Sequence, residues 1–246
     1  MNKLLFKFEI KKLLSQTSTK VIAIILILFP IIIVFGIVSP SQQFSITMDN
    51  FASAADFSNA ILGFLNSLGF YYIILVVLSA STLSKEIENK YLYFVLSAVP
   101  SCSRLFIYKA LSVSLIFSFM VILSSLSGFI TYSILYLGTF VVSVQIMGVL
   151  LWGIAMSFLI TMIYMMLLTI CNIITDGSIF ASLTIAIITV VLLIVLGAVE
   201  GTMNYLPAWS LDYMPDRNNI FLVLMYFVIL IISSISMYIC TKKKRI

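Results

Sequence analysis

The sequence contains no histidine among its 246 residues, and only 9% of them are charged. The absence of histidine excludes zinc and haem sites built on imidazole, and hydrolases with a Ser-His-Asp triad. No phosphate loop of the form G-x-x-x-x-G-K followed by Ser or Thr occurs either. Asp176 and Glu200 stand at opposite ends of one predicted span, too far apart to act as acid and base. We therefore expect no enzyme activity, no metal and no cofactor in this chain.

Apolar residues, by contrast, are abundant. They make up 62% of the chain, and the mean hydropathy is +1.20. Soluble domains have about 25% charged residues, so this composition does not suit a water-exposed globule. The net charge of +5 needs no nucleic-acid partner, because cytoplasmic loops of membrane proteins collect Lys and Arg. The composition predicts an all-α polytopic membrane protein.

Six apolar stretches approach the roughly 20 residues that a helix needs to cross a bilayer. They cover residues 21–38, 60–83, 110–132, 145–170, 179–198 and 220–240. No internal repeat, low-complexity tract or soluble domain interrupts them. We therefore expect residues 1–246 to form a single transmembrane domain, with residues 199–219 as a polar outer loop.

The basic residues are distributed very unevenly among the predicted loops. Five precede the first span, four lie between spans two and three, and four end the chain. The fourteenth, Arg217, lies in the outer loop. Because Lys and Arg collect in cytoplasmic loops, we expect both termini and residues 84–109 in the cytoplasm. Cys102, Cys171 and Cys240 then lie near cytoplasmic span ends, where reducing conditions disfavour disulfides.

Residues 1–20 combine lysines with apolar side chains. Lys3, Lys7 and Lys11 share one line of a helix, and Phe6, Ile10 and Leu13 share another. Such a helix can lie in the membrane interface while its lysines extend to water. The segment is either an N-terminal interfacial helix of this kind or a basic tail that sets the topology.

Polar side chains within the predicted spans are uncharged, since all 23 charged residues lie outside the span cores. Ion-coupled transporters commonly hold ionisable residues within the membrane, so this pattern disfavours that class. Asn66 is the most notable polar residue at depth, and we expect it to hydrogen-bond to a neighbouring helix. Ser118 and Ser125 either pack helices together or line a translocation pathway, for which Asn66 is a third candidate.

Residues 84–109 form the longest charged interruption between apolar stretches. Apolar side chains recur along this segment at helical spacing, and Pro100 then ends the helix because proline lacks an amide hydrogen. A short amphipathic helix of this kind can bind to the membrane or to a groove on a soluble partner.

This segment resembles the corresponding loop of the ABC-2 type permeases, the membrane subunits of ATP-binding-cassette exporters. Six spans, cytoplasmic termini and a basic amphipathic start are similar to that family as well. The family's Gly-Thr pair is missing here, and one extra residue follows the proline. The matching residues are, in order, Glu86 or Glu88, the apolar run 92–99, Pro100, Ser103-Arg104 and Lys109.

The resemblance implies a cytoplasmic coupling helix between spans two and three that docks into a separate ATPase subunit. The alternative for its charged residues is a solvated loop face. The candidate ATPase-coupling residues are Glu86, Glu88, Tyr91, Tyr93, Phe94, Arg104 and Lys109.

The same resemblance implies partners and a location. The chain would pair with a second copy or a related permease, in contact with lipid, in a bacterial cell membrane. ATP and Mg would be bound by the ATPase, and the cargo would be an amphipathic peptide, bacteriocin, drug or lipid. The family holds a short re-entrant helix between spans five and six, and residues 199–219 are either its counterpart or a plain surface loop.

Two other classes fit the composition. A secondary transporter or channel half would move its cargo without an ATPase, under an ion gradient. A non-transporting scaffold or sensor subunit would share every feature of residues 84–109 and would differ only in moving nothing. An intramembrane enzyme has no acid, base or metal constellation to support it.

Overall fold

Long apolar stretches fold into helices, because a helix satisfies its own backbone hydrogen bonds where no water is present. The computed structural model describes residues 3–38, 51–88, 102–199, 205–207, 209–211 and 219–243. All regular secondary structure in these residues is helical, and none of them lies in a strand. The all-α prediction is thereby confirmed for the described part of the chain.

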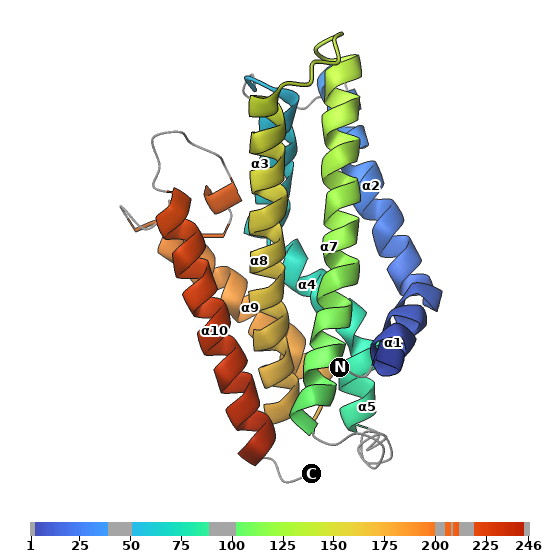
Figure 1. Cartoon of the computed structure of the whole chain (residues 1–246), viewed down its shortest axis with the longest axis vertical. Coiled ribbons are helices and arrows are strands. Elements are labelled where there is room, and N and C mark those ends of the chain that lie inside the picture. The colour runs from blue at the N-terminus through green and yellow to red at the C-terminus, as the bar shows by residue number, and fades with distance from the viewer. Residues whose placement is uncertain are drawn as a thin grey trace.

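The long helices run along the bundle in alternating directions (Figure 1). Each of α2, α7, α8, α9 and α10 is long and apolar enough to cross a membrane, and α3 with α4 makes a sixth crossing if the pair is one span. The chain is therefore a membrane-embedded helical protein. The helical elements are α1 (Lys3–Ser15), α2 (Thr17–Val38), α3 (Ala54–Ser67), α4 (Phe70–Ser79), the π-helical turn η1 (Ala80–Ser84), α5 (Lys85–Glu88), α7 (Cys102–Leu135), α8 (Val144–Ile174), α9 (Ile179–Gly197), the 3-10 turn η3 (Trp209–Leu211) and α10 (Asn219–Lys243).

The second crossing differs from its prediction as a continuous helix over residues 60–83. It begins earlier, at Ala54, and a bend of 68° separates α3 from α4. Gly69 lies at the bend with φ of +73°, a left-handed conformation that glycine adopts at little cost. A Cβ at this position would also clash with the side chain of Val190 in α9. The local backbone and the neighbouring helix therefore both require glycine here.

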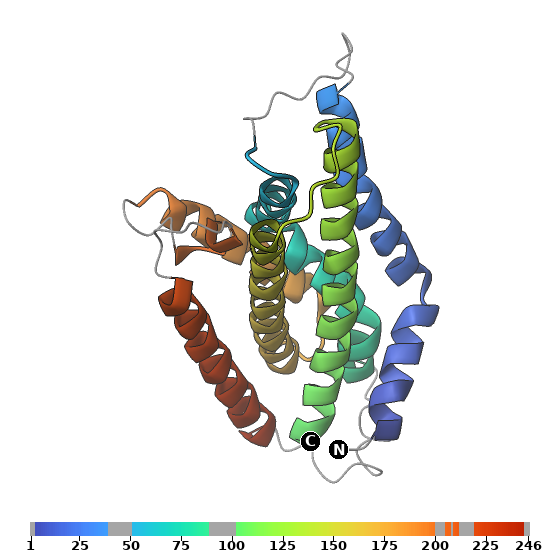
Figure 2. The same cartoon turned by 45° about the horizontal axis from the view of Figure 1, so that its top comes forward.

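The centre of the bundle is formed by α3, α7 and α8. Figures 1 and 2 show α1 and α2 on one side of α7, and α10 beside α8 on the other. Phe57, Phe117 and Met165, one from each central helix, are fully buried. Phe57 stacks on Tyr132 with ring centroids 4.3 Å apart, which joins α3 to α7. Such aromatic pairs contribute about 0.5–1.5 kcal/mol beyond their buried area.

One end of the bundle gathers α1, α5, the start of α7 and the end of α10 (Figure 1). We call this the basic end, because the lysines whose side chains the structure describes belong to these helices or to the first turn of α2. They are Lys7, Lys11, Lys12, Lys20, Lys85, Lys109 and Lys242.

The amphipathic pattern expected for residues 1–20 is present in α1. Leu13 is buried and Ile10 is half-buried, whereas Lys7 and Lys11 are exposed. Most of the outer loop 199–219 lies outside the described residues. In its described part, the carbonyl oxygen of Ser210 accepts a hydrogen bond from the Trp152 indole nitrogen at 3.2 Å, which attaches η3 to α8.

Candidate functional site

Four charged side chains meet inside the basic end, where α1, α5 and α7 converge. The Nζ atom of Lys109 in α7 lies 2.6 Å from a carboxylate oxygen of Glu9 in α1 and 2.8 Å from one of Glu86 in α5. Lys12 of α1 pairs with the other carboxylate oxygen of Glu86 at 2.5 Å. We call these four residues the charge cluster.

Burial distinguishes the charge cluster from surface ion pairs. Lys109 is 1% exposed and Glu9 is 3% exposed, whereas Lys12 keeps about a third of its side chain accessible, at 30%. The two lysines balance the two glutamates, so the cluster carries no net charge. Removing one partner of a buried pair leaves an uncompensated charge and costs about 3–5 kcal/mol. The charge cluster therefore holds α1, α5 and α7 in one arrangement.

The local structure around each member explains its position. Glu9 and Lys12 stand three residues apart on α1, on the helix face that also carries the buried Leu13. Glu86 follows the π-helical turn η1, which has wider turns than an α-helix and changes the direction in which the next side chains point. After this turn Glu86 faces inward, and Glu88 is exposed.

The end of α8 and the turn that follows it hold α5 from another direction. Ser84, directly before α5, donates a hydrogen bond from its hydroxyl to the side-chain oxygen of Asn172 at 2.7 Å. Gly177 in the turn has φ of +82°, and a Cβ on it would clash with the carbonyl oxygen of Ser84. The turn and the start of α5 are thus in close backbone contact. A displacement of α5 would reach α8 and α9 as well as α1 and α7.

The seven predicted coupling residues fall into three groups. Glu86 and Lys109 belong to the charge cluster and face the interior, so neither forms part of a solvated loop face. Glu88 is exposed at the end of α5, and Arg104 lies in the first turn of α7. The other three, together with the apolar run 92–99, lie outside the described residues: Tyr91, Tyr93 and Phe94.

Two of the three predicted pathway residues lie in α7, in different surroundings. The carbonyl oxygen of Ser125 accepts a hydrogen bond from the Ser58 hydroxyl at 2.7 Å, so this serine packs α7 against α3. Ser118 lines a pocket of ≈ 520 Å³ between α7, α8 and α10. Its hydroxyl has no hydrogen-bond partner among the described residues. The geometry therefore supports packing for Ser125 and a lining position for Ser118.

The expected hydrogen bond from Asn66 to a neighbouring helix is wrong. Asn66 is buried, but neither its side-chain oxygen nor its side-chain nitrogen has a hydrogen-bond partner in the described structure. The expectation assumed an uninterrupted span, whereas α3 ends at Ser67 and α4 leaves at an angle of 68°. Instead, the Asn66 backbone carbonyl accepts the Gly69 amide at 2.9 Å and stabilises the bend.

Sequence reasoning missed Glu9 and Lys12 as members of the site. A signal was present, because Glu9 is the only acidic residue among residues 1–20 and stands one turn before Leu13 on the apolar line. A buried acid needs a cation or a hydrogen-bond donor beside it. Its partner, Lys109, is 100 residues away along the chain, and no local pattern connects the two.

The charge cluster is suited to mechanical linkage. Each of its four members is ion-paired with another, so none stands alone as a base or nucleophile. In the described ranges, no three His, Cys, Asp or Glu side chains are grouped in a way that could hold a metal ion.

No protein-family model matches the chain, and no curated protein matches it. The resemblance to ABC-2 type permeases therefore rests on residues 84–109 and on the pattern of spans.

Proposed function

We propose that this chain is the transmembrane permease subunit of an ABC-2 type exporter, driven by a separate ATP-binding-cassette ATPase. The observation that carries the proposal is the charge cluster, which joins α5 to α1 and α7. Because α5 is the start of residues 84–109, an ATPase that moves this segment would move two further helices with it. Closely packed groups transmit displacements, since they cannot deform continuously.

In this proposal the basic end faces the cytoplasm of a bacterial cell. Thirteen of the fourteen basic residues lie before the first span, in residues 84–109 or at the C-terminus, as the positive-inside rule requires for cytoplasmic segments. The amphipathic α1 then lies in the inner membrane interface. The exposed Glu88 and the start of α7 stand where a cytoplasmic ATPase would dock.

Two such subunits would form the pathway between them. ATP-driven closure of the ATPases would rock the helices as rigid bodies, so that each state keeps its backbone hydrogen bonds. Apart from the charge cluster at the basic end, the described crossings carry no buried charge. The pocket beside Ser118 is otherwise lined by apolar side chains. These surroundings suit an amphipathic peptide, a bacteriocin, a drug or a lipid as cargo.

The buried carboxylates of Glu9 and Glu86 favour one alternative, a transporter driven by an ion gradient. Carriers of that class hold ionisable residues in the membrane as relays or ion ligands. Such a carrier would move its cargo without an ATPase, and substitution of Glu9 by Gln would abolish the ion dependence. The exporter would show no transport until the ATPase is added.

Co-expression with a candidate ATP-binding-cassette ATPase tests the docking step. Glu88→Lys and Arg104→Glu reverse charges outside the charge cluster, and Lys242→Glu at the end of α10 is the matched control. Like charges brought together at an interface cost several kcal/mol, so each reversal should reduce recovery of the complex at least tenfold. The control should leave recovery unchanged. An ATPase that binds all variants equally well would remove α5 and α7 from the interface.

A second variant separates docking from coupling. The pair Glu9→Gln with Lys109→Met removes one charge of each sign from the cluster, keeps the Lys12–Glu86 pair, and leaves Glu88 and Arg104 in place. We expect this variant to bind the ATPase like the wild-type chain, with little cargo movement per ATP hydrolysed. If the purified chain instead moves solutes under an ion gradient without any ATPase, the exporter assignment is wrong.

A further inference from the structure

The chain from Phe70 to Glu88 is one continuous helix in three parts, which are α4, the π-helical turn η1 and α5. The Ala80 amide donates to the Val76 carbonyl, four residues back, whereas the Lys85 amide donates to the Ala80 carbonyl, five residues back. A π-helical turn of this kind holds one residue more than the α-helical turn that it replaces. The residues of α5 therefore stand one position out of the α-helical register of α4.

Two side-chain contacts after η1 depend on this register. The Ser84 hydroxyl donates to the Asn172 side chain at 2.7 Å, and Glu86 pairs with Lys109 at 2.8 Å. Lys85, between them, is exposed. If η1 became α-helical, the residues after it would rotate by about 100° and advance by about 1.5 Å, so that each takes the place of the next. Lys85 would then replace Glu86 beside Lys109.

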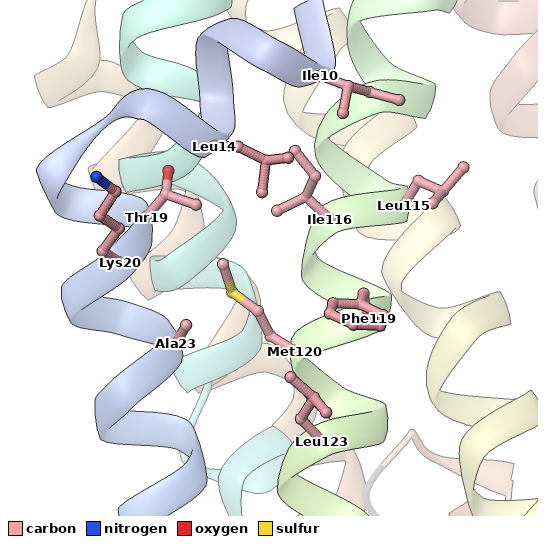
Figure 3. A pocket seen from close by; sticks show the side chains of 10 residues that line it. All are labelled: Ile10, Leu14, Thr19, Lys20, Ala23, Leu115, Ile116, Phe119, Met120 and Leu123. Atoms are coloured by element: carbon pink, nitrogen blue, oxygen red, sulfur yellow. The ribbon is translucent and has the colours of Figure 1, made fainter. Parts of the chain in front are cut away.

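Charge opposes this second register. The charge cluster would change from two lysines and two glutamates to three lysines and one glutamate. The pocket between α1, α2 and α7 supplies no further acid, because eight of its ten lining side chains are apolar and the others are Thr19 and Lys20 (Figure 3). A buried cation without a partner is strongly unfavourable. The charge cluster therefore selects the register that contains the π-helical turn.

We propose that η1 is a register switch: α5 has two positions one residue apart, and the charge cluster holds it in the observed one. Because π-helical turns are rare within α-helices, the regular helix is the intrinsically favoured form, and α5 would relax into it once Glu86 leaves the cluster. The slip would turn the faces of residues 85–88 by about 100°. Packed elements with two discrete arrangements convert a local contact into a larger displacement.

The register depends on this chain alone, so its test is independent of the proposed exporter function. Deletion of Ala80 should give a continuous α-helix that leaves Ser84 and Glu86 in their observed places, and the chain should be recovered in monodisperse form like the wild type. Insertion of one alanine after Ala80 moves Lys85 into the place of Glu86, and should lower that recovery at least about tenfold. Size-exclusion chromatography in detergent measures both. A helix without an extra residue would be disrupted by either change, so equal losses overturn the proposal.

Exchanges of neighbouring side chains test whether α5 can slip. Glu86→Lys alone should lower recovery at least about tenfold, because it buries a third lysine. Lys85→Glu with Glu86→Lys should restore most of the recovery, since a slip by one residue carries the new carboxylate at position 85 into the cluster. Glu86→Ile with Ile87→Glu is the matched control, because η1 holds no residue for a slip in the opposite direction. In a fixed helix the order of the two exchanges would be reversed, since a third buried lysine is worse than an isoleucine.

Labelling of one introduced cysteine identifies the register directly. In a chain whose three native cysteines are replaced by serine, Ile87→Cys lies at a half-buried position and should react slowly with a maleimide. The slip carries position 87 to the exposed place of Glu88. In the background of the exchange at positions 85 and 86, labelling should therefore become as fast as that of Glu88→Cys in the unexchanged chain. It should stay slow when Ala80 is deleted. An exchange recovered no better than Glu86→Lys, or unchanged labelling at position 87, overturns the proposal.

Discussion

α7 and α9 are both apolar enough to cross a membrane, yet they differ sharply in burial. In the most apolar stretch of α7, 61% of the residues are buried, compared with 11% in α9. The less buried helix is the more apolar one, because the mean hydropathy of these stretches is 2.2 for α7 and 3.0 for α9. In lipid an exposed aliphatic side chain has no water to avoid, so hydrophobicity does not decide which helix is central. The centre is occupied by the helix with more polar side chains.

Hydrogen bonds show what the polar side chains do in the two regions. In the centre some of them join helices: Ser58 of α3 bonds to Ser125 of α7, and Asn59 of α3 donates to the Val149 carbonyl of α8 at 2.9 Å. On α9, the buried Ser182 bonds to Asn172 of α8 at 3.4 Å, whereas Thr189 bonds back to its own helix, to the carbonyl of Ile185 at 2.8 Å. Interhelical hydrogen bonds and close packing therefore hold the central helices, and the outer face of α9 is free to meet lipid.

Among substitutions that compare the buried centre with the exposed surface, the largest loss of stability is expected in the charge cluster. Lys109→Met would leave Glu9 and Glu86 buried without their shared cation, and should lower the free energy of unfolding by about 3–5 kcal/mol. Lys242→Met on α10 removes the same charge from an exposed position and should change it by less than about 0.5 kcal/mol. Unfolding of the purified protein by a denaturing detergent, followed by tryptophan fluorescence, measures both values. Adding Glu9→Gln to Lys109→Met should recover part of the loss. A Lys109→Met protein as stable as the wild type would show that the cluster is not a structural link.

A pair of leucines compares packing in the two regions directly. Leu168 of α8 is fully buried, and Leu192 of α9 is 56% exposed. Truncating a buried leucine removes contacts and leaves a cavity, so Leu168→Ala should cost about 2–5 kcal/mol. Leu192→Ala should cost less than about 0.5 kcal/mol, because lipid replaces the lost contacts. The same unfolding assay applies. A large loss at Leu192 that disappears on dilution would mean that a second copy of the chain covers α9.

Sequence reasoning reached the helical fold because long apolar runs have few structural solutions in a membrane. Five of the six predicted spans correspond to single helices, and the sixth is a bent pair. The bend was not predicted, since a lone glycine in an apolar run is tolerated in many helices. The left-handed backbone at Gly69 and its contact with Val190 of α9 are what show that glycine is required.

Two of the four residues of the charge cluster could be identified from the sequence. Glu86 and Lys109 were singled out from their order in residues 84–109, Glu86 as a contact with a partner and Lys109 as a residue that braces the coupling helix. Their pairing with each other and with Glu9 depends on how α1 folds back against α7, and this is set by tertiary packing across 100 residues. The role of Tyr91, Tyr93 and Phe94 in bracing the coupling helix stays a prediction.

Two glycines on α8 give the finest test of the difference between a packed face and a free one. A Cβ on Gly153 would overlap the side-chain amide of Asn59 in α3, whereas a Cβ on Gly148 would meet no atom within 4 Å. Gly153→Ala should therefore cost about 1–3 kcal/mol, because α3 and α8 must separate or Asn59 must give up its bond to Val149. Gly148→Ala should be neutral or stabilising by up to about 1 kcal/mol, since alanine favours the helix. Both substitutions add one methyl group to the same helix, so helix propensity cancels between them. If Gly153→Ala is as well tolerated as Gly148→Ala, α3 and α8 are not in close contact, and the hydrogen bond from Asn59 cannot be what holds the centre together.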